Sequence, residues 1–410
     1  MASPGEAVDA MVARAGAVAT ERVAIDRCVG RMLAEPILAE RDSPAADVSA
    51  MDGYAVRRAE LAGCVEGSCA MPVGFEVETG SSPAALPAGV AARVFTGGVI
   101  PQGADTVIRR EDVRESEDSI VLDRLETLPD KGTYIRRRGE NLARGARVVE
   151  AGRDLGPTQI AAARSVSLAS EVVVHKKVRV AILVTGNEVQ AAEPRPYGEA
   201  DARVWDSNGP GLASLVGAVG WAEPVWIDRV GDSEAQTRAA IERGVRDADV
   251  LVTTGGVSMG DHDVVPRTLV GLGGEAVYHH LSMRPGKPNL GAIMPDATPV
   301  VSLPGNPVSA MVGGVVLLGP VLRRLAGCPE VAFRPRVSVR LREGAGPDRP
   351  LSLWRYLPAV IDRQGRAIPV EQRGSGDAPA LGRSEGLIEV PPGEEADASR
   401  RPWLRWTLGI

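Results

Sequence analysis

The middle third of the chain alternates apolar strand-like runs with helical segments. Continuously apolar, β-branched runs ending near glycine predict buried strands at 178–186, 249–256 and 298–303. Helices are predicted at 209–219 and from a Ser233 cap to about residue 246, and another starts at Pro307 with Asn306 as its cap. This alternation predicts a mostly parallel sheet covered on both faces.

The flanking segments show other patterns. Residues 46–139 are rich in glycine, proline and short valine-bearing runs, which predicts a small β-rich domain. Residues 1–45 and 140–176 look helical and are expected to form one discontinuous helical domain. Alternating short strands predict a C-terminal β domain at 328–410, after a central domain at 177–327. The predicted fold class is therefore α/β multidomain.

Composition and charge narrow the classes of function. A net charge of −6 and 3% aromatic residues argue against a nucleic-acid partner. Four cysteines without a C-x-x-C pair are too few for a disulfide framework, and the first residues lack a signal-peptide pattern. The apolar run at 308–322 is shorter than a membrane span. We therefore expect a cytoplasmic, reducing location and no membrane partner.

Polar loops that contain glycine follow nearly every strand of the predicted sheet. They lie at 185–188, 205–208, 254–261 and 303–307. In open α/β sheets ligands bind where such loops meet, and glycine turns offer N–H groups to phosphate. Nearby carboxylates suit Mg²⁺: Glu188, Asp206, Asp232, Asp261 and Asp263. One such loop is usually structural, but their recurrence predicts a phosphate-and-metal site.

Two common nucleotide motifs are missing. The Gly286-Lys287 pair lacks the first glycine of a P-loop, and no G-x-G-x-x-G follows a strand. Arg284 and Lys287 lie instead in a proline-rich loop. Such cations are usually only solvated, but beside anion-binding loops they would neutralise an anionic ligand.

Seven segments occur in the order of one known family. They are 49–56, Thr96-Gly97 with 101–105, 138–141, 206–208, 253–263, 285–288 and 303–310. On these segments the chain resembles the MoeA-type molybdopterin molybdenumtransferases and is similar to the E domain of gephyrin. The resemblance runs from about residue 5 to the C-terminus.

This resemblance implies an enzyme of molybdenum cofactor biosynthesis. Such an enzyme inserts molybdate into adenylylated molybdopterin and hydrolyses the adenylate with Mg²⁺ or another divalent cation. It implies a four-domain homodimer, in which the small β domain of one subunit faces the α/β and C-terminal domains of the other. Molybdopterin adenylyltransferase and acceptor molybdoenzymes are the further expected partners.

The family motifs also imply roles for individual residues. Positions important for activity are Asp52, Thr96, Glu188, Asp232 and Asp263, and the metal ligands are Glu188, Asp261 and Asp263. Substrate-binding positions are Asp206, Ser207, Asn208, Gly255, Gly256, Ser258, Gly260, Pro304, Gly305, Asn306 and Pro307. Molybdate-binding positions are Arg284, Lys287, Arg355 and Ser375.

Some residues depart from the family pattern. Asn187 and Asn141 stand where aspartate is usual, which removes negative charge near the expected metal. These departures keep a second hypothesis open, a scaffold that binds a partner protein on the same fold, as gephyrin also does. A third hypothesis is molybdopterin adenylyl transfer, because adenylyltransferases resemble the α/β region alone.

Overall fold

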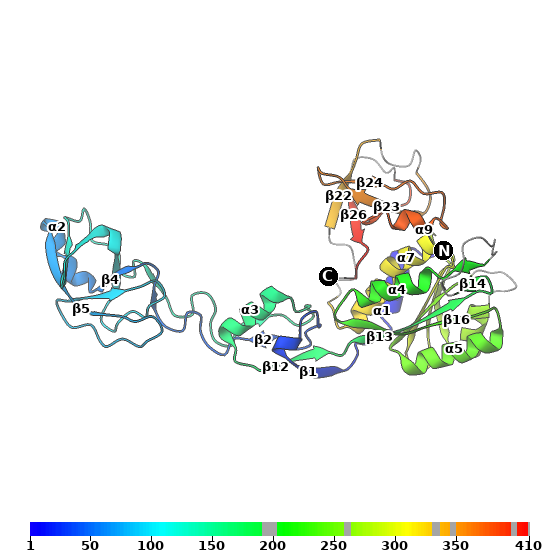
Figure 1. Ribbon diagram of the computed structural model, residues 1–410, viewed down its shortest axis with the longest axis horizontal. Coiled ribbons are helices and arrows are strands. Elements are labelled where there is room, and N and C mark those ends of the chain that lie inside the picture. The colour runs from blue at the N-terminus through cyan, green and yellow to red at the C-terminus, as the bar shows by residue number, and fades with distance from the viewer. Residues whose placement is uncertain (191–202, 258–263, 330–336, 345–349, 395–399, 409–410) are drawn as a thin grey trace, which may run out of the picture. The chain divides into compact units, whose positions relative to one another are not determined.

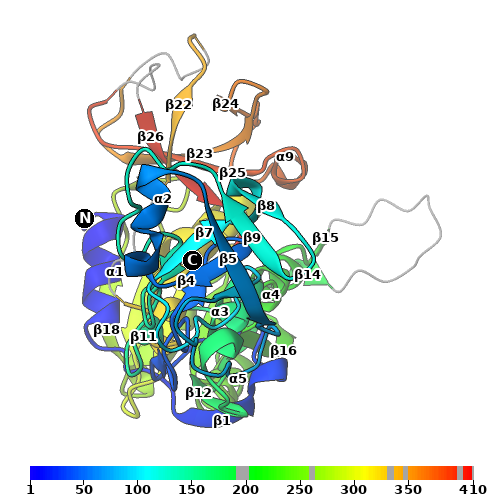
Figure 2. The same ribbon diagram turned by 90° about the vertical axis from the view of Figure 1, so that its left-hand side faces the viewer.

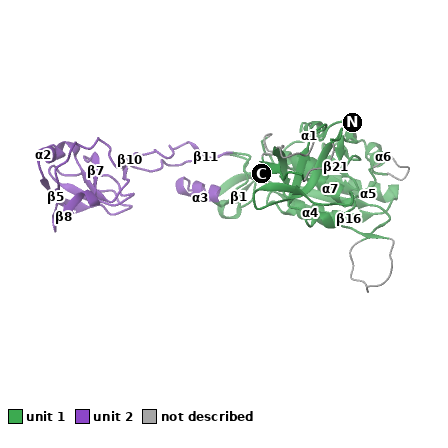
Figure 3. Ribbon diagram, turned by 90° about the horizontal axis from the view of Figure 1, so that it is seen from above, with its two compact units in different colours: residues 1–35, 151–157, 170–410 green, residues 36–150, 158–169 purple. Residues whose placement is uncertain are grey.

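The computed structural model describes residues 1–190, 203–257, 264–329, 337–344, 350–394 and 400–408. The chain divides into two compact units (Figure 3), and each is described by itself. Unit 1 comprises residues 1–35, 151–157 and 170–410, and unit 2 comprises residues 36–150 and 158–169. The domain boundaries inferred from the sequence stay predictions.

A six-stranded, mostly parallel sheet forms the centre of unit 1 (Figure 1). Its order is β16 (Ala222–Val230), β13 (Val178–Thr185), β17 (Val250–Thr254), β21 (Pro299–Leu303), β20 (Leu290–Ile293) and β18 (Glu275–His279). The first four strands are parallel, and β20 is antiparallel to both of its neighbours. The predicted strands and sheet type are confirmed.

Successive residues of the central strands pack on opposite faces of the sheet. Val180 and Ile182 belong to one apolar cluster, whereas Ala181 and Leu183 belong to another. The first cluster includes side chains of α1 (Pro4–Val12), α4 (Asn208–Gly217), α7 (Pro307–Gly313) and α8 (Gly319–Leu325). The second includes side chains of α5 (Glu234–Asp247) and α6 (Val264–Gly271). Each fully buried aliphatic side chain stabilises this arrangement by about 1.5–3 kcal/mol.

The longest apolar helix lies inside this packing. It runs from Pro307 to Leu325 and joins α7 to α8 through a π-helical turn, Gly314–Leu318. Its 19 residues are long and apolar enough to cross a membrane, so the sequence argument from length was wrong. However, 83% of its most apolar window is buried inside the protein, as in the core helix of a soluble protein. Its apolar composition therefore has a packing explanation.

The C-terminal strands close into a small barrel (Figure 2). The sheet order is β19 (Met283–Arg284), β23 (Trp354–Ile361), β24 (Arg366–Pro369), β22 (Val337–Leu341), β26 (Arg400–Arg405) and β25 (Gly386–Val390). Strand β23 also pairs with β25, which closes the ring around Leu341, Ile388 and Trp403. Because β19 belongs to the loop before β20, its pairing with β23 attaches the barrel to the α/β layers.

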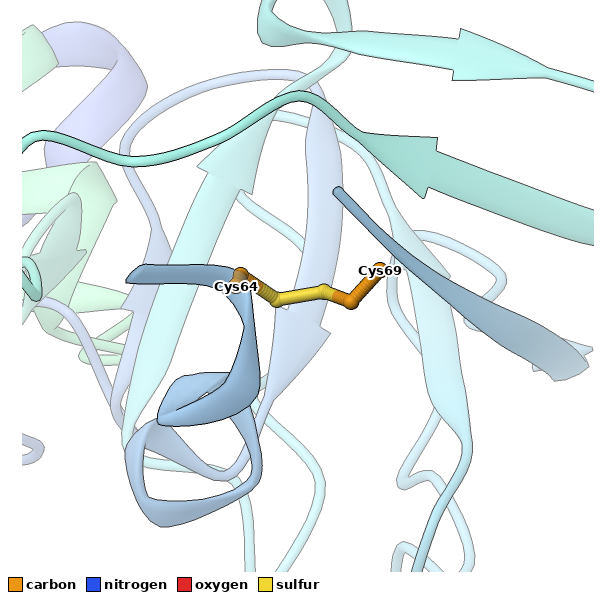
Figure 4. The surroundings of a disulfide bond; sticks show 2 residues. All are labelled: Cys64 and Cys69. Carbon is orange, nitrogen blue, oxygen red and sulfur yellow. A yellow bond between two sulfur atoms is a disulfide. The ribbon is translucent and has the colours of Figure 1, made fainter. Parts of the chain in front are cut away.

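Unit 2 contains a six-stranded sheet of its own. Its order is β7 (Thr106–Arg109), β4 (Gly53–Val56), β6 (Ala91–Val94), β5 (Cys69–Glu76), β9 (Ser119–Leu122) and β8 (Val113–Glu115). A disulfide joins Cys64 in α2 (Gly63–Glu66) to Cys69 in β5 (Figure 4). This bond is one local link between residues five apart, and it differs from the reduced thiols expected from the sequence.

Residues 1–45 and 140–176 were expected to be helical, and this prediction is wrong for much of both segments. Besides α1, they hold one longer helix, α3 (Pro157–Val166), and four strands: β1 (Thr20–Ala24), β2 (Ile37–Leu38), β11 (Arg147–Val149) and β12 (Glu171–His175). Strand β1 pairs with β12 and β2 with β11, in each case antiparallel. The valines of β12 favour an extended backbone, and pairing with a distant partner decides the outcome.

The remaining elements are short. They are the pairs β3 (Val48–Ser49) with β10 (Ile135–Arg136) and β14 (Val189–Gln190) with β15 (Val204–Trp205), the helix α9 (Ala378–Leu381), and 3₁₀ turns at Ile25–Arg27, Arg58–Leu61 and Arg110–Asp112. The β14–β15 pair places the 205–208 loop beside the end of β13, because Asp206 N donates to Gln190 O.

Candidate functional site

The loops after the parallel strands are hydrogen-bonded to one another. Thr185, which ends β13, donates from Oγ1 to the carbonyl oxygen of Thr254 at 3.4 Å. Gly255, which follows β17, donates its N–H to the carbonyl oxygen of Leu303 at 3.0 Å. The structure thus brings together three of the loops that the sequence analysis singled out.

Glycine is required at the centre of this contact. Gly255 has φ +91°, and a Cβ there would lie 2.4 Å from the carbonyl oxygen of Thr185. Gly256 also has a left-handed backbone, with φ +59°. Both positions therefore disfavour a side chain. The Gly255 N–H is engaged by Leu303, so within this pair an accessible N–H for an anion would come from Gly256.

Asn208 connects the 205–208 loop to the turn after β21. Its Nδ2 donates to Thr254 Oγ1 at 2.8 Å and to the carbonyl oxygen of Gly305 at 2.7 Å. The hydroxyl of Thr254 donates in turn to the carbonyl oxygen of Pro304 at 3.0 Å. The other amide atom, Asn208 Oδ1, is buried and accepts no hydrogen bond from the described residues. Such an acceptor normally has a water or ligand partner.

Asp206 has a structural position instead. Its side chain is 1% exposed, and its two oxygens accept from Gly209 N and from the Arg229 guanidinium, each at 2.8 Å. The carboxylate therefore fixes the start of α4 and pairs with β16, and it has little capacity left for a ligand. The adjacent Ser207 is exposed and makes no capping bond. Arg229 was missed in the sequence analysis because nothing in its strand indicates a buried pair.

Glu188 and Asp232 follow the neighbouring strands β13 and β16. Asn187 N donates to Asp232 Oδ2 at 3.4 Å, and Asp232 N donates to Asn187 Oδ1 at 3.1 Å. The Glu188 carboxylate is exposed, lies over Gly186, and has no hydrogen-bonding partner in the described part of the chain. A carboxylate without a partner fits a hard cation such as Mg²⁺.

Four of the predicted residues lie outside the described residues, namely Ser258, Gly260, Asp261 and Asp263. In the chain that is described, no three acidic, histidine or cysteine side chains gather as metal ligands do. Of the acidic residues expected to position the metal or water, Glu188 at the end of β13 and Asp232 at the end of β16 are therefore the ones that the structure describes.

A pocket of about 890 Å³ lies between two segments of the α/β layers, residues 283–288 and the turn after β21, and the C-terminal barrel. Its basic lining residues are Arg284, Lys287, Arg355 and Arg373, and none of its described lining residues is acidic. Arg284 and Arg355 are direct register partners across β19 and β23. The four residues that the family motifs assign to molybdate thus line one hollow, since Ser375 does so as well.

Burial makes Arg355 the least solvated of these cations. It is 4% exposed and donates to the carbonyl oxygen of Glu394 at 3.1 Å. Burial lowers the pKa of Arg355 below its usual range, and the positive charge of Arg401 lowers it further by a smaller amount. Guanidinium groups stay protonated in proteins, so an anion in the pocket would relieve the cost of this charge.

The turn after β21 forms the wall shared by the strand-end loops and this pocket. Asn306 occupies the cap position of α7 as predicted, but its side chain makes no capping bond. Instead Nδ2 donates to Ser375 Oγ at 3.0 Å, while Val308 N donates to the carbonyl oxygen of Ser375 at 3.0 Å. Ser375 thus takes the first helix N–H, which leaves the Asn306 amide for the barrel. Pro307 begins α7 at the position where proline fits.

Asp52 and Thr96 lie together in unit 2. Asp52 Oδ1 accepts from Thr96 N at 2.7 Å and from Thr96 Oγ1 at 2.8 Å. These hydrogen bonds, with a smaller effect of Arg110, lower the pKa of Asp52 below its usual range. Both residues line a hollow of about 660 Å³ together with Arg109 and Arg110.

Comparisons with known proteins agree with this architecture. The model "MoeA N-terminal region (domain I and II)" matches residues 2–167, and "Probable molybdopterin binding domain" matches 181–324. The molybdopterin molybdenumtransferase of Synechococcus elongatus is 35% identical over 393 residues, 94% of each chain. The enzyme of that name from Nostoc is 33% identical over 398 residues, 95% of this chain and 89% of that one. The chain belongs to the molybdopterin molybdenumtransferase family.

Solved structures agree with this membership. A crystal structure of the molybdopterin biosynthesis MoeA protein from Pyrococcus horikoshii matches with a TM-score of 0.78 at 27% identity and covers 99% of both chains. A second one, at 24% identity, matches with a TM-score of 0.83 over 98% of this chain and 99% of that one. These matches confirm the α/β multidomain fold and the family resemblance found in the sequence.

We predict that Asp206→Asn destabilises the protein by about 2–3 kcal/mol, because it removes the charge of a buried carboxylate that binds Gly209 N and Arg229. Urea unfolding followed by circular dichroism measures the change. Asp228→Asn is the matched control, since Asp228 also lies on β16 but forms a partly exposed pair with Arg243. The control is expected to change stability by less than about 0.5 kcal/mol. Equal small effects would contradict the structural role of Asp206.

We predict that Thr96→Val raises the pKa of Asp52 toward its ordinary value, because one of two hydrogen bonds to the carboxylate is lost. Carbon-13 NMR titration of the aspartate carboxyl groups measures it. Since the native pKa is lowered, the stability due to Asp52 is present above the unfolded-state pKa and is lost as pH falls through the native pKa. Thr133→Val is the control, because the Thr133 hydroxyl donates to the backbone carbonyl of Asp130 and to no carboxylate among the described residues. An unchanged Asp52 pKa in Thr96→Val would refute this cause.

Proposed function

We propose that this protein is a molybdenum insertase, which converts adenylylated molybdopterin and molybdate into molybdenum cofactor and AMP. The observation that carries the proposal is the pocket between the turn after β21 and the barrel, with four basic and no acidic residues among its described lining. Molybdate is a tetrahedral dianion, so its binding needs positive charge and hydrogen-bond donors.

Arg284, Lys287 and Arg355 supply the charge, and Ser375 supplies a hydroxyl. Because Ser375 Oγ already accepts from Asn306, its own O–H is left to donate to an oxyanion. The pairing of β19 with β23 holds Arg284 opposite Arg355, so two guanidinium groups approach the ligand from paired strands. This arrangement favours a small multivalent anion.

The strand-end loops are the proposed site of the pterin nucleotide. Asn208 Oδ1 offers a buried acceptor without a described partner, and Gly256 offers a backbone N–H that no side chain covers. The turn after β21 contacts both subsites, since the Gly305 carbonyl bonds to Asn208 and the Asn306 amide bonds to Ser375. A nucleotide bound there would lie next to the oxyanion, which makes the reaction between them effectively intramolecular.

Adenylate hydrolysis requires water to attack one phosphorus while the P–O bond between the two phosphates breaks and AMP leaves. We assign the positioning of this water to Glu188, Asp232 and Asp263, with Asp261 as a further metal ligand. A divalent cation, Mg²⁺ by the oxygen character of these ligands, would neutralise phosphate charge when bound. The unpartnered carboxylate of Glu188 and the fixed carboxylate of Asp232 support this assignment.

A homodimer would bring Asp52 and Thr96 of one subunit to the loops of the other. The proposed partners are molybdopterin adenylyltransferase and acceptor molybdoenzymes, and the proposed location is the cytoplasm. Relatives named molybdopterin molybdenumtransferase match 90–95% of this chain, which supports an insertase over an adenylyltransferase resembling only the α/β region. No observation specifically favours a scaffold.

We predict that Glu188→Gln slows AMP release from adenylylated molybdopterin by about 10²-fold, because a charged group at the reacting phosphates is lost. The variant is also expected to fail to restore molybdoenzyme activity in an insertase-deficient host. Its urea unfolding should match the wild type, because Glu188 is exposed and has no partner among described residues. Glu223→Gln is the control, an exposed carboxylate paired with Lys177 at the opposite, amino-terminal end of the sheet. Full activity of Glu188→Gln would refute the proposed role.

The shared cleft is tested by mixing two inactive variants. Asp52→Asn and Glu188→Gln are each expected to be inactive alone. In randomly formed mixed dimers one of the two sites is intact, so co-expression should restore about one quarter of wild-type AMP release. Size-exclusion chromatography with light scattering confirms the dimer. No recovery in mixed dimers would place each site within a single subunit and contradict the shared cleft.

A further inference from the structure

The oxyanion pocket contains a fourth cation that the family motifs did not assign. Arg373 lines the pocket beside Arg284, Lys287 and Arg355. We propose that Arg373 is a specificity-determining residue that favours doubly charged tetrahedral oxyanions over singly charged ones of the same shape. This inference rests on the proposed function, because it concerns the same pocket.

The carboxylate of the same turn, Asp377, bonds to other groups. Asp377 accepts from the backbone N–H of Arg373 at 3.0 Å and lies 3.9 Å from the Arg383 guanidinium. The Arg373 guanidinium itself has no hydrogen-bonding or acidic partner in the described part of the chain. Asp377 thus fixes the backbone of the 373–377 turn while the side-chain charge remains for the pocket.

The same turn carries Ser375. Gly374, between the two residues, has φ +133°, and Ser375 is held to the start of α7 by the bonds to Asn306 and Val308. Arg373 is therefore two residues from an anchored hydroxyl of the pocket. The hydrogen bonds of this turn therefore fix the backbone from which the Arg373 side chain extends.

Exposure decides how strongly Arg373 acts. Arg355 is buried, whereas Arg373 is exposed at the pocket, so its charge acts through water. At about 6 Å in water, one positive charge changes affinity about threefold for a monoanion and about tenfold for a dianion. The effect of Arg373 therefore depends on ligand charge, which a purely structural role would not produce.

Equilibrium dialysis of the full chain against sodium molybdate or perrhenate, with metal counted by mass spectrometry, tests this proposal. Perrhenate is also tetrahedral but carries one charge. We expect Arg373→Gln to weaken molybdate binding about tenfold and perrhenate binding about threefold. Arg373→Lys keeps the charge and should retain the wild-type ratio of the two affinities. Arg363→Gln is the matched control, since Arg363 is an exposed arginine of the same barrel that does not line the pocket.

The outcomes separate the two proposals. One outcome is that the wild type binds molybdate and that Arg373→Gln has the same affinities for both anions as the control Arg363→Gln. In that case Arg373 has no role, and the insertase proposal stands. If Arg373→Gln weakens both anions by the same factor, selection by charge is overturned. If the wild type binds neither anion at millimolar concentration, the oxyanion pocket fails, and the proposed function fails with it.

Discussion

The turn after β21 is the constraint on which the site depends. Gly305 offers its carbonyl to Asn208 on one side, and Asn306 turns its amide to Ser375 on the other. This is possible because Pro307 starts α7 without needing a capped N–H at its own position, and Ser375 takes the N–H of Val308. A four-residue turn therefore joins the strand-end loops to the barrel. Its geometry would set how close the proposed nucleotide and oxyanion sites lie.

The charged groups around the site fall into two sets: those that are hydrogen-bonded by the protein and those that have no protein partner among the described residues. Asp206 has both carboxylate oxygens engaged by the protein at the start of α4, and Asp377 has Oδ2 engaged in the barrel turn. Glu188 and the Arg373 guanidinium have no such partner among the described residues. A charged group without a partner gains most from an opposite charge in a ligand. Motif matching cannot make this distinction, because Asp206 and Glu188 both match the family pattern.

Local sequence predicted the strands that carry the site but not the contacts between distant segments. Strands β13, β17 and β21 are continuous apolar runs, and such runs have few alternatives to a buried parallel strand. By contrast, the register of Arg284 against Arg355 joins positions 71 residues apart, and no local pattern encodes it. The same reason explains why the pairing of β1 with β12 and the Asp206–Arg229 pair were not foreseen.

The structure also explains how the chain tolerates asparagine at position 187. Asn187 Oδ1 accepts the N–H of Asp232, and its own backbone N–H donates to the Asp232 carboxylate. A neutral amide oxygen accepts that N–H as an aspartate oxygen would. The substitution therefore preserves the link between the loops after β13 and β16 while it removes one negative charge. Because the link, rather than the charge of residue 187, holds Asp232 beside the end of β13, this departure weighs little in favour of a scaffold without catalysis.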